Sequence, residues 1–307
     1  MLKNWGIIET EDLPAQAGKK YPNALKEALK SLIPSMGPKK LYYKGNWSED
    51  IFKNCLAVVG SRHLTRYGRQ ATEQIVTECA AAGITIVSGF MYGGDEAAHS
   101  TCVKAGGRTI AVMPCGIDLI FPPQQKELYQ EILNNNGLII SEYEPGFKPV
   151  NYSFVQRDRI VAGLSRAVLV TEAALNSGSL ITANYAKKYG RKIFALPGQI
   201  TSEVSKGTLM LIKEGAEPVT EANDILSFYK VLINSKKEKS SSSPTVSSLT
   251  DKNSLEEKII AHLQRESIEA DNLARALSVS VSQLGTTLSL MQLKGIINQS
   301  SGKYYLS

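Results

Sequence analysis

The sequence lacks the signals of several large classes of protein. Its 307 residues contain only four cysteines, with no C-x-x-C pair and no histidine at zinc-ligand spacing from them. We therefore expect buried free thiols in a reducing compartment, and no metal site. No apolar run is long enough to cross a bilayer, and no secretory signal is visible in the first residues. These absences predict a cytoplasmic protein without a membrane partner.

The motifs of common nucleotide-dependent and hydrolytic enzymes are also missing. The chain contains no G-x-x-x-x-G-K-[ST], no G-x-G-x-x-G after an apolar strand, no G-x-S-x-G and no H-E-x-x-H. These absences argue against a P-loop ATPase and against binding of NAD or FAD. We therefore predict no cofactor and no catalytic machinery.

From residue 55 onward, short apolar runs alternate with helical patterns. The runs are nearly continuous, which is typical of parallel strands buried on both faces. We expect strands at Cys55–Gly60, Ile84–Gly89, Thr109–Met113, Leu138–Ser141, Ala167–Thr171 and Lys192–Leu196. We expect helices at Gly68–Ala82, Glu96–Ala105, Gln124–Asn134, Asp158–Leu164 and Ile181–Tyr189. This repetition predicts an α/β fold with a doubly wound, mainly parallel sheet, in which ligands bind beyond the carboxyl ends of the strands.

Composition divides the chain into four parts. Residues 1–54 form a mixed lead-in segment, with a short strand at Leu41–Tyr43 and a helix near Ala24–Leu32. Residues 55–233 carry the predicted sheet. Residues 234–254 are rich in Ser and Lys, which predicts a flexible linker. Residues 255–307 contain three amphipathic helical patterns and two short strands, an order that resembles a winged helix.

Small and cationic residues follow the predicted strands, where the loops of a parallel sheet would meet at one edge. Glycine allows close approach of a phosphate, helix-start amides bind anions, and Arg or Lys supplies positive charge. The candidates are Gly60, Ser61 and Arg62 after the first strand, Gly89 after the second, Ser177, Gly178 and Ser179 after the fifth, and Lys206 after the sixth. Each loop can also be read as an ordinary turn. Together, with a net charge of +6, they predict an electropositive groove for a phosphodiester chain.

Two further candidates allow more than one interpretation. Arg157 and Arg159 either reach a phosphate or pair with Asp158 and Glu142. The loop that contains Phe121 and Lys126 is suited either to stacking a base or to packing.

Asp95 and His99 stand four residues apart at a predicted helix start. They form either an acid–base pair or half of a metal site, or else a helix N-cap and a histidine bonded within its own turn. We favour the second interpretation, because the sequence offers no third ligand.

The motifs occur in an order that resembles the DNA-processing protein A (DprA/Smf) family. They include VVGSR at 58–62, VSG at 87–89, GGDEAAH at 93–99, SEY at 141–143, AGLSRAVLV at 162–170, SGSLITA at 177–183 and PG at 197–198. The resemblance covers roughly residues 21–226. The sequence departs from the family at Pro123, where a family lysine contacts DNA, and at Asp158, where the family has asparagine.

This resemblance implies a Rossmann-like core that binds single-stranded DNA, forms a homodimer and loads a RecA-type recombinase during natural transformation, without catalysis. It assigns the main DNA contact to Arg62. It also assigns phosphate-facing roles to Gly60, Ser61 and the loop at 177–179.

Two other functions were weighed against this one. Similar cores occur in nucleoside-monophosphate phosphoribohydrolases, but the corresponding stretch at 173–182 lacks their P-G-G-x-G-T-x-x-E signature. A regulator could instead bind duplex DNA through the C-terminal domain. That domain carries five basic and five acidic residues, a balance that is poor for phosphate contact.

Overall fold

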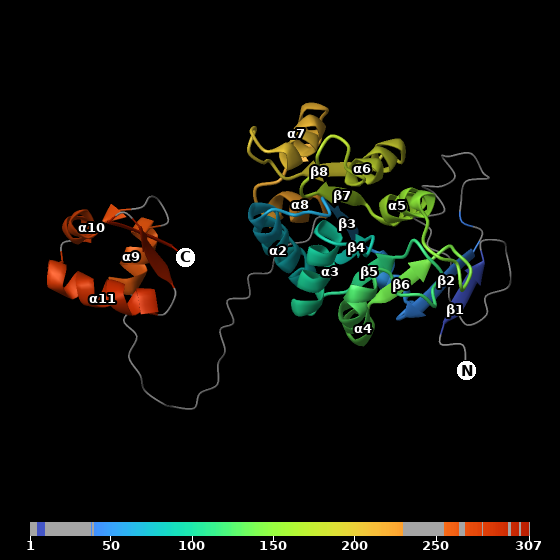
Figure 1. Cartoon of the computed structure of the whole chain (residues 1–307), viewed down its shortest axis with the longest axis horizontal. Helices are drawn as coiled ribbons and strands as arrows, with labels where there is room; N and C mark the ends of the chain where they lie inside the picture. The colour runs from blue at the N-terminus through green and yellow to red at the C-terminus, as the bar shows by residue number, and fades with distance from the viewer. Residues whose placement is uncertain are drawn as a thin grey trace. The chain divides into compact units, whose positions relative to one another are not determined.

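The computed structural model describes residues 5–9, 38, 40–229, 255–263, 268–277, 279–293, 296–300 and 302–306. The chain forms two compact units, residues 1–235 and 236–307 (Figure 1). The helix predicted near Ala24–Leu32 and the linker predicted at 234–254 lie outside the described residues.

The first unit is built around one sheet with the strand order β1-β2-β6-β5-β4-β3-β7-β8-β9. The pairs formed among β3 to β9 are all parallel. At one edge β2 pairs antiparallel with β6, and β1 pairs antiparallel with β2. The bounds are β1 Gly6–Glu9, β2 Lys40–Gly45, β3 Cys55–Val59, β4 Thr85–Ser88, β5 Thr109–Val112, β6 Leu138–Ser141, β7 Ala167–Val170, β8 Lys192–Ala195 and β9 Glu217–Pro218. The six strands predicted after residue 54 are confirmed to within one residue at each end.

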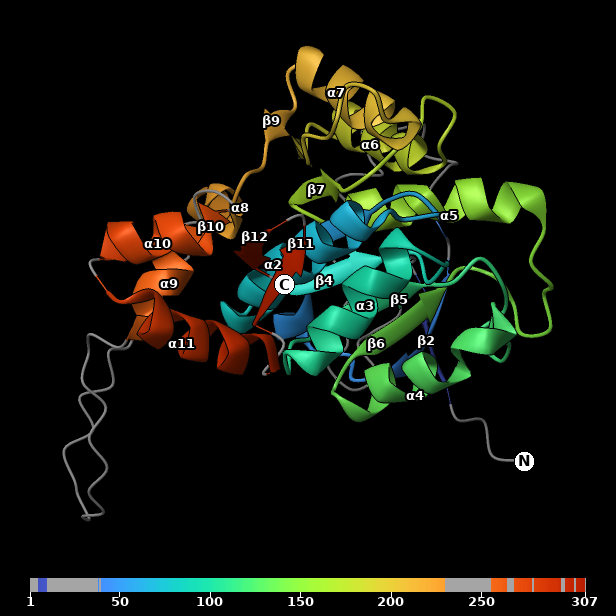
Figure 2. The ribbon, with the colours of Figure 1, turned by 60° about the vertical axis from the view of Figure 1, so that its left-hand side comes forward.

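Helices cover both faces of this sheet (Figures 1 and 2). One layer contains α2 Arg66–Ala81, α3 Gly94–Lys104, α4 Lys126–Asn134 and α8 Ala222–Tyr229, and the other contains α5 Asn151–Leu164, α6 Ser179–Lys188 and α7 Lys206–Lys213. Leu56 and Val58 of β3 pack in the first layer, whereas Ala57 and Val59 pack in the second. Every position of the strand is therefore buried, which explains the continuous apolar run in the sequence.

Several elements differ from the sequence-based expectation, among them helix α8 and strand β10 (Ile268–Glu269), where no element was predicted. The edge strands β1 and β9 were not predicted; β9 has only two residues and is recruited by pairing with β8. Helix α5 begins at Asn151, seven residues before the predicted start. There, the Ser153 hydroxyl accepts a hydrogen bond from the Val150 N–H (3.1 Å), which closes the first helical turn.

The path of the chain creates a point at which the strand order reverses. From β3 the chain proceeds outward through β4, β5 and β6, and then returns to place β7 against the other side of β3. In open α/β sheets the loops beyond such a switch point form a crevice, because they diverge to opposite faces. The carboxyl ends of β3, β4 and β7 are therefore where a ligand site is expected.

The second unit has the predicted winged-helix order. It contains α9 Leu255–Leu263, α10 Ala270–Leu277, α11 Val281–Leu293 and a small antiparallel sheet of β10 Ile268–Glu269, β12 Lys303–Leu306 and β11 Ile297–Ser300. Apolar side chains from all three helices, among them Ile259, Leu273 and Leu288, form its core. Across the parts of the chain that the structure describes, every helix is too short or too polar to span a membrane.

Candidate nucleic-acid interface

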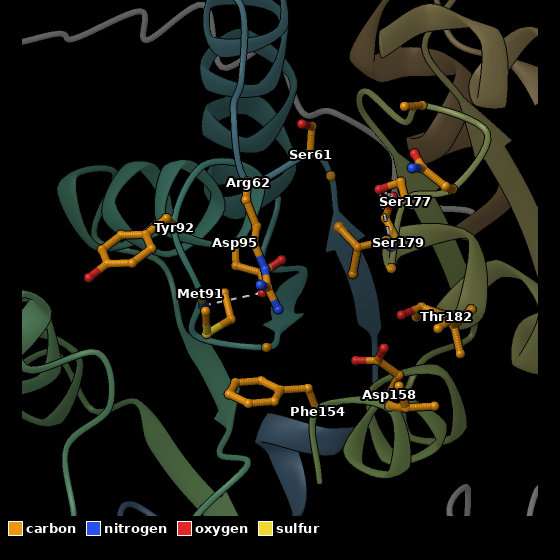
Figure 3. A pocket seen from close by; sticks show the side chains of 18 of the residues that line it. Ser61, Arg62, Met91, Tyr92, Asp95, Phe154, Asp158, Ser177, Ser179 and Thr182 are labelled. Atoms are coloured by element: carbon orange, nitrogen blue, oxygen red, sulfur yellow. Dashed lines mark hydrogen bonds between the residues drawn. The ribbon is translucent and has the colours of Figure 1, made fainter. Parts of the chain in front are cut away.

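A pocket of about 570 Å³ opens at the switch point of the sheet. Its walls come from the loops after β3, β4 and β7, from the first turns of α5 and α6, and from Val204 in the segment after β8 (Figure 3). The predicted site residues that line it are Gly60, Ser61, Arg62, Gly89, Arg157, Ser177, Gly178 and Ser179. The expected convergence of loops on one edge is thus seen for the loops after β3, β4 and β7.

The loop that carries Gly60, Ser61 and Arg62 is held tightly by its neighbours. The Ser61 N–H donates to the Glu172 carbonyl (2.7 Å), and the Ser61 carbonyl accepts from the Gly94 N–H (3.0 Å). A Cβ atom at Gly94 would lie only 2.6 Å from the Gly60 Cα, so glycine is required for this close backbone approach. The Ser61 hydroxyl accepts from the His63 N–H (3.1 Å), which further fixes the turn.

Arg62 projects from this rigid loop into the pocket. Its side chain is exposed, and Figure 3 shows it extending between the β4 and β7 sides of the site. The guanidinium carbon lies 5.5 Å from the centre of the Phe154 ring, a cation–π distance. Phe154 packs in turn against Phe121, at 5.8 Å between ring centres, so Phe121 supports the wall of the pocket. Arg62 therefore presents its charge to the pocket.

The start of α6 forms the wall opposite the β4–α3 loop. The helix begins at Ser179, and the hydroxyls of Ser177 and Ser179 lie 2.8 Å apart. The amides of Ser179, Leu180 and Ile181 already donate within this turn, to Ser177 Oγ (3.4 Å) and to the carbonyls of Ser177 (3.1 Å) and Gly178 (2.9 Å). What this helix start offers an anion is therefore its dipole and the two serine hydroxyls. The predicted Ser-Gly-Ser element is thus located at a helix start that lines the pocket.

Arg157 forms part of the floor and is only 4% exposed. Its Nε donates to Asp158 Oδ1 (2.9 Å), and its Nη1 donates to the carbonyls of Val112 (2.6 Å) and Gly89. A Cβ atom at Gly89 would overlap the guanidinium, so that glycine makes room for Arg157. Of the two interpretations of Arg157, the structure shows internal pairing. Both residues line the pocket, and their contact with DNA stays a prediction.

The floor also carries two carboxylates that share this arginine. Asp95 Oδ2 lies 3.7 Å from Arg157 Nη2 and accepts from the Met91 N–H (3.2 Å). Burial raises the pKa of Asp158 to about 7, with Arg157 opposing the shift and Asp95 adding to it. Burial also raises the pKa of Asp95, although Arg157 opposes the change. Arg157 and, more weakly, Arg62 therefore act on the two acids, and the floor holds a titratable proton near neutral pH.

Asp95 and His99 do not form the acid–base pair or half metal site considered above. Gly93 is the N-cap of α3 and Asp95 lies in the first turn, so the predicted cap was wrong by two residues. His99 is fully buried, and its Nδ1 bonds to Thr109 Oγ1 (2.7 Å) on β5 rather than within its own turn. Burial lowers the pKa of His99 to about 3, so the ring is neutral. Within the described residues, no group of three potential metal ligands occurs.

The remaining predicted site residues lie outside the pocket lining. Arg159 is 4% exposed and pairs with Glu142, so the expected DNA contact is corrected to an internal ion pair. Lys206 is exposed at the start of α7 and pairs with Glu203 (2.5 Å). Lys126 is exposed at the start of α4.

Sequence reasoning missed the contribution of α5 to the site. Asn151, Phe154 and Val155 line the pocket from the first turns of this helix. The predicted start at Asp158 left these residues in a loop. Phe154, Val161 and Leu164 share one helical face, and that spacing is the signal that could have located them.

The fold and the pocket define a Rossmann-like α/β protein with a separate winged helix. A family model described as DNA recombination-mediator protein A matches residues 14–230, and one for the DprA winged helix domain matches residues 243–303. The chain belongs to the DNA recombination-mediator protein A (DprA/Smf) family. This confirms the resemblance seen in the sequence and places the chain among recombination mediators rather than enzymes.

Individual relatives agree with this assignment. Protein Smf of Synechocystis is 35% identical over 93% of this chain and 77% of its own length. The solved structure of DNA processing protein A from Streptococcus pneumoniae has a TM-score of 0.64 at 38% identity, covering 73% of this chain and 74% of its own. The structure of a Helicobacter pylori DNA processing protein A, which concerns its single-stranded DNA binding mode, has a TM-score of 0.62 at 32% identity. The match covers 74% of this chain and 95% of the H. pylori chain.

Proposed function

We propose that this chain binds single-stranded DNA in the switch-point pocket, with Arg62 as the principal contact. The observation that carries the proposal is the exposed Arg62 side chain, held on a hydrogen-bonded loop opposite the Ser177 and Ser179 hydroxyls at the start of α6. A guanidinium, hydroxyl groups and the positive end of a helix dipole bind phosphate oxygens, and Phe154 offers a ring for a base. The related H. pylori protein, described by its single-stranded DNA binding mode, supports the same ligand.

Gly60 and Ser61 position Arg62, and the loop at 177–179 receives the phosphate on the other side of the pocket. Lys126 and Lys206 lie beyond the pocket lining and add charge along the approach of the strand. We further propose that the protein acts as a homodimer that protects incoming DNA and loads a RecA-type recombinase during natural transformation.

DNA binding is tested by titrating the full chain with single-stranded and duplex DNA of equal length at several salt concentrations. Wild-type protein should prefer the single strand, with affinity falling steeply as salt rises. Arg62→Ala should weaken single-strand binding by about 1–3 kcal/mol. Arg69→Ala is the matched control, because Arg69 is also exposed but lies on α2 outside the pocket lining. Equal affinity of wild type and Arg62→Ala would refute the role of the pocket.

Recombinase loading is tested separately. RecA filament growth on DNA coated with a single-strand-binding protein should start sooner with wild-type protein, and Arg62→Ala should remove this gain. Light scattering of the free protein reports whether it is a dimer. If the wild-type protein binds single-stranded DNA but leaves RecA filament growth unchanged, the proposal of recombinase loading is wrong and the proposal of DNA binding stands.

A further inference from the structure

The β4–α3 loop places an aromatic side chain at the edge of the pocket. Tyr92 lines the pocket and is 39% exposed, whereas its neighbour Met91 is 7% exposed and packs inward. Strand β3, which is followed by the loop that carries Arg62, lies between β4 and β7. Figure 3 accordingly shows Tyr92 on one side of Arg62 and Ser177 and Ser179 on the other. Tyr92 therefore extends the row of candidate contacts past Arg62, away from α6.

The Tyr92 ring is fixed at its polar end. Its hydroxyl donates to Gln124 Oε1 (2.7 Å), in the short helical turn Pro123–Gln125 that precedes α4. A hydrogen bond of this kind orients the phenol and reduces the entropy that the side chain would lose when a ligand binds. An oriented and exposed ring is what stacking on an unpaired base requires.

We propose that Tyr92 stacks on a DNA base next to the nucleotide held at Arg62. The bound strand would then cross the sheet edge from the start of α6, over Arg62, to the β4–α3 loop and towards α4. This inference rests on the proposed function and deepens it, because a ring can stack only on a base that is free of its complementary strand. Stacking makes Tyr92 a determinant of the preference for single strands over duplex, without selecting a particular base.

The test uses the full chain and single-stranded oligonucleotides that carry one 2-aminopurine at successive positions. Binding of wild-type protein should quench 2-aminopurine strongly at one position, and Tyr92→Leu should lose that quenching. The affinity of Tyr92→Leu for single strands should fall about 5- to 100-fold, with a much smaller change for duplex. Tyr92→Phe should keep the quenching, because it keeps the ring.

Tyr67 supplies the matched control. It is 49% exposed and donates its hydroxyl to the Pro197 carbonyl (2.5 Å), but it is not part of the pocket lining. Tyr67→Leu should leave affinity and quenching unchanged. If Tyr92→Leu binds single strands as wild type does while Arg62→Ala binds poorly, the stacking inference is overturned and the proposed function stands. If wild-type protein itself fails to bind single strands, both are overturned.

Discussion

The rim and the floor of the pocket each carry an arginine, and the two arginines have opposite surroundings. At the rim, Arg62 is exposed and its guanidinium lies over the Phe154 ring. At the floor, Arg157 is 4% exposed and is enclosed by two carboxylates and two carbonyls. The same residue type therefore supports the fold in one place and is available to a ligand in the other. The number of acceptors around each guanidinium makes the difference.

The largest expected effect is the loss of stability on replacing Arg157, on the pocket floor. Arg157→Met should lower the free energy of unfolding by about 3–5 kcal/mol, because Asp95 and Asp158 would remain buried without their shared cation. Urea unfolding followed by circular dichroism measures the change. Arg62 is exposed, so the free energy of unfolding of Arg62→Ala should lie within about 0.5 kcal/mol of the wild-type value. If Arg157→Met and Arg62→Ala lost similar amounts of unfolding free energy, Arg157 would not support the fold more than Arg62 does.

A smaller effect is expected in the pH dependence of DNA binding, through the Asp158 carboxyl on the pocket floor. Because the pKa of Asp158 is raised to about 7, DNA affinity should fall by about 3- to 10-fold between pH 6 and pH 8, as a negative charge develops under the phosphates. Asp158→Asn should bind more tightly at pH 8 and lose most of this dependence. Fluorescence anisotropy at constant ionic strength measures both. Arg62, Arg157 and Asp95 also act on this carboxyl, and all three remain in the variant.

The titration of Asp158 also makes the free energy of unfolding depend on pH. The pKa of Asp158 is higher in the folded protein than its usual value of about 3.8, so the folded state keeps the proton longer. The free energy of unfolding should therefore decline as pH rises from about 4 to about 7. In Asp158→Asn the decline should be shallower. Parallel pH profiles of the two proteins would show that another group is responsible.

The smallest expected effect lies beyond the rim. Lys126→Ala should reduce the salt dependence of single-strand binding by about 0.7 in the slope of log K against log salt, the value for one phosphate contact. Lys206→Ala should change it less, because Lys206 already pairs with Glu203. Titrations at four or more salt concentrations measure the slopes. If the slope is unchanged in both variants, neither lysine contacts a phosphate, and the DNA contacts do not extend to Lys126 or Lys206.

Much of the fold was predictable because its signals are local. The six buried strands of the core sheet are continuous apolar runs, and burial on both faces imposes that pattern on the sequence. The edge strands β1 and β9 carry no such pattern, because pairing with a neighbour rather than burial defines them. The start of α5 was missed because the Ser153–Val150 hydrogen bond that closes its first turn leaves only a weak trace in the sequence.

The sequence by itself determined the α/β class, the winged helix and the loops at which Arg62 and the start of α6 are found. Only the tertiary structure decided which cations face a ligand. Arg62, Arg157 and Arg159 look alike in a sequence, but their roles depend on acceptors contributed by other strands and helices. A charge buried among such acceptors is held by them, whereas a charge left in an open pocket can bind a phosphate.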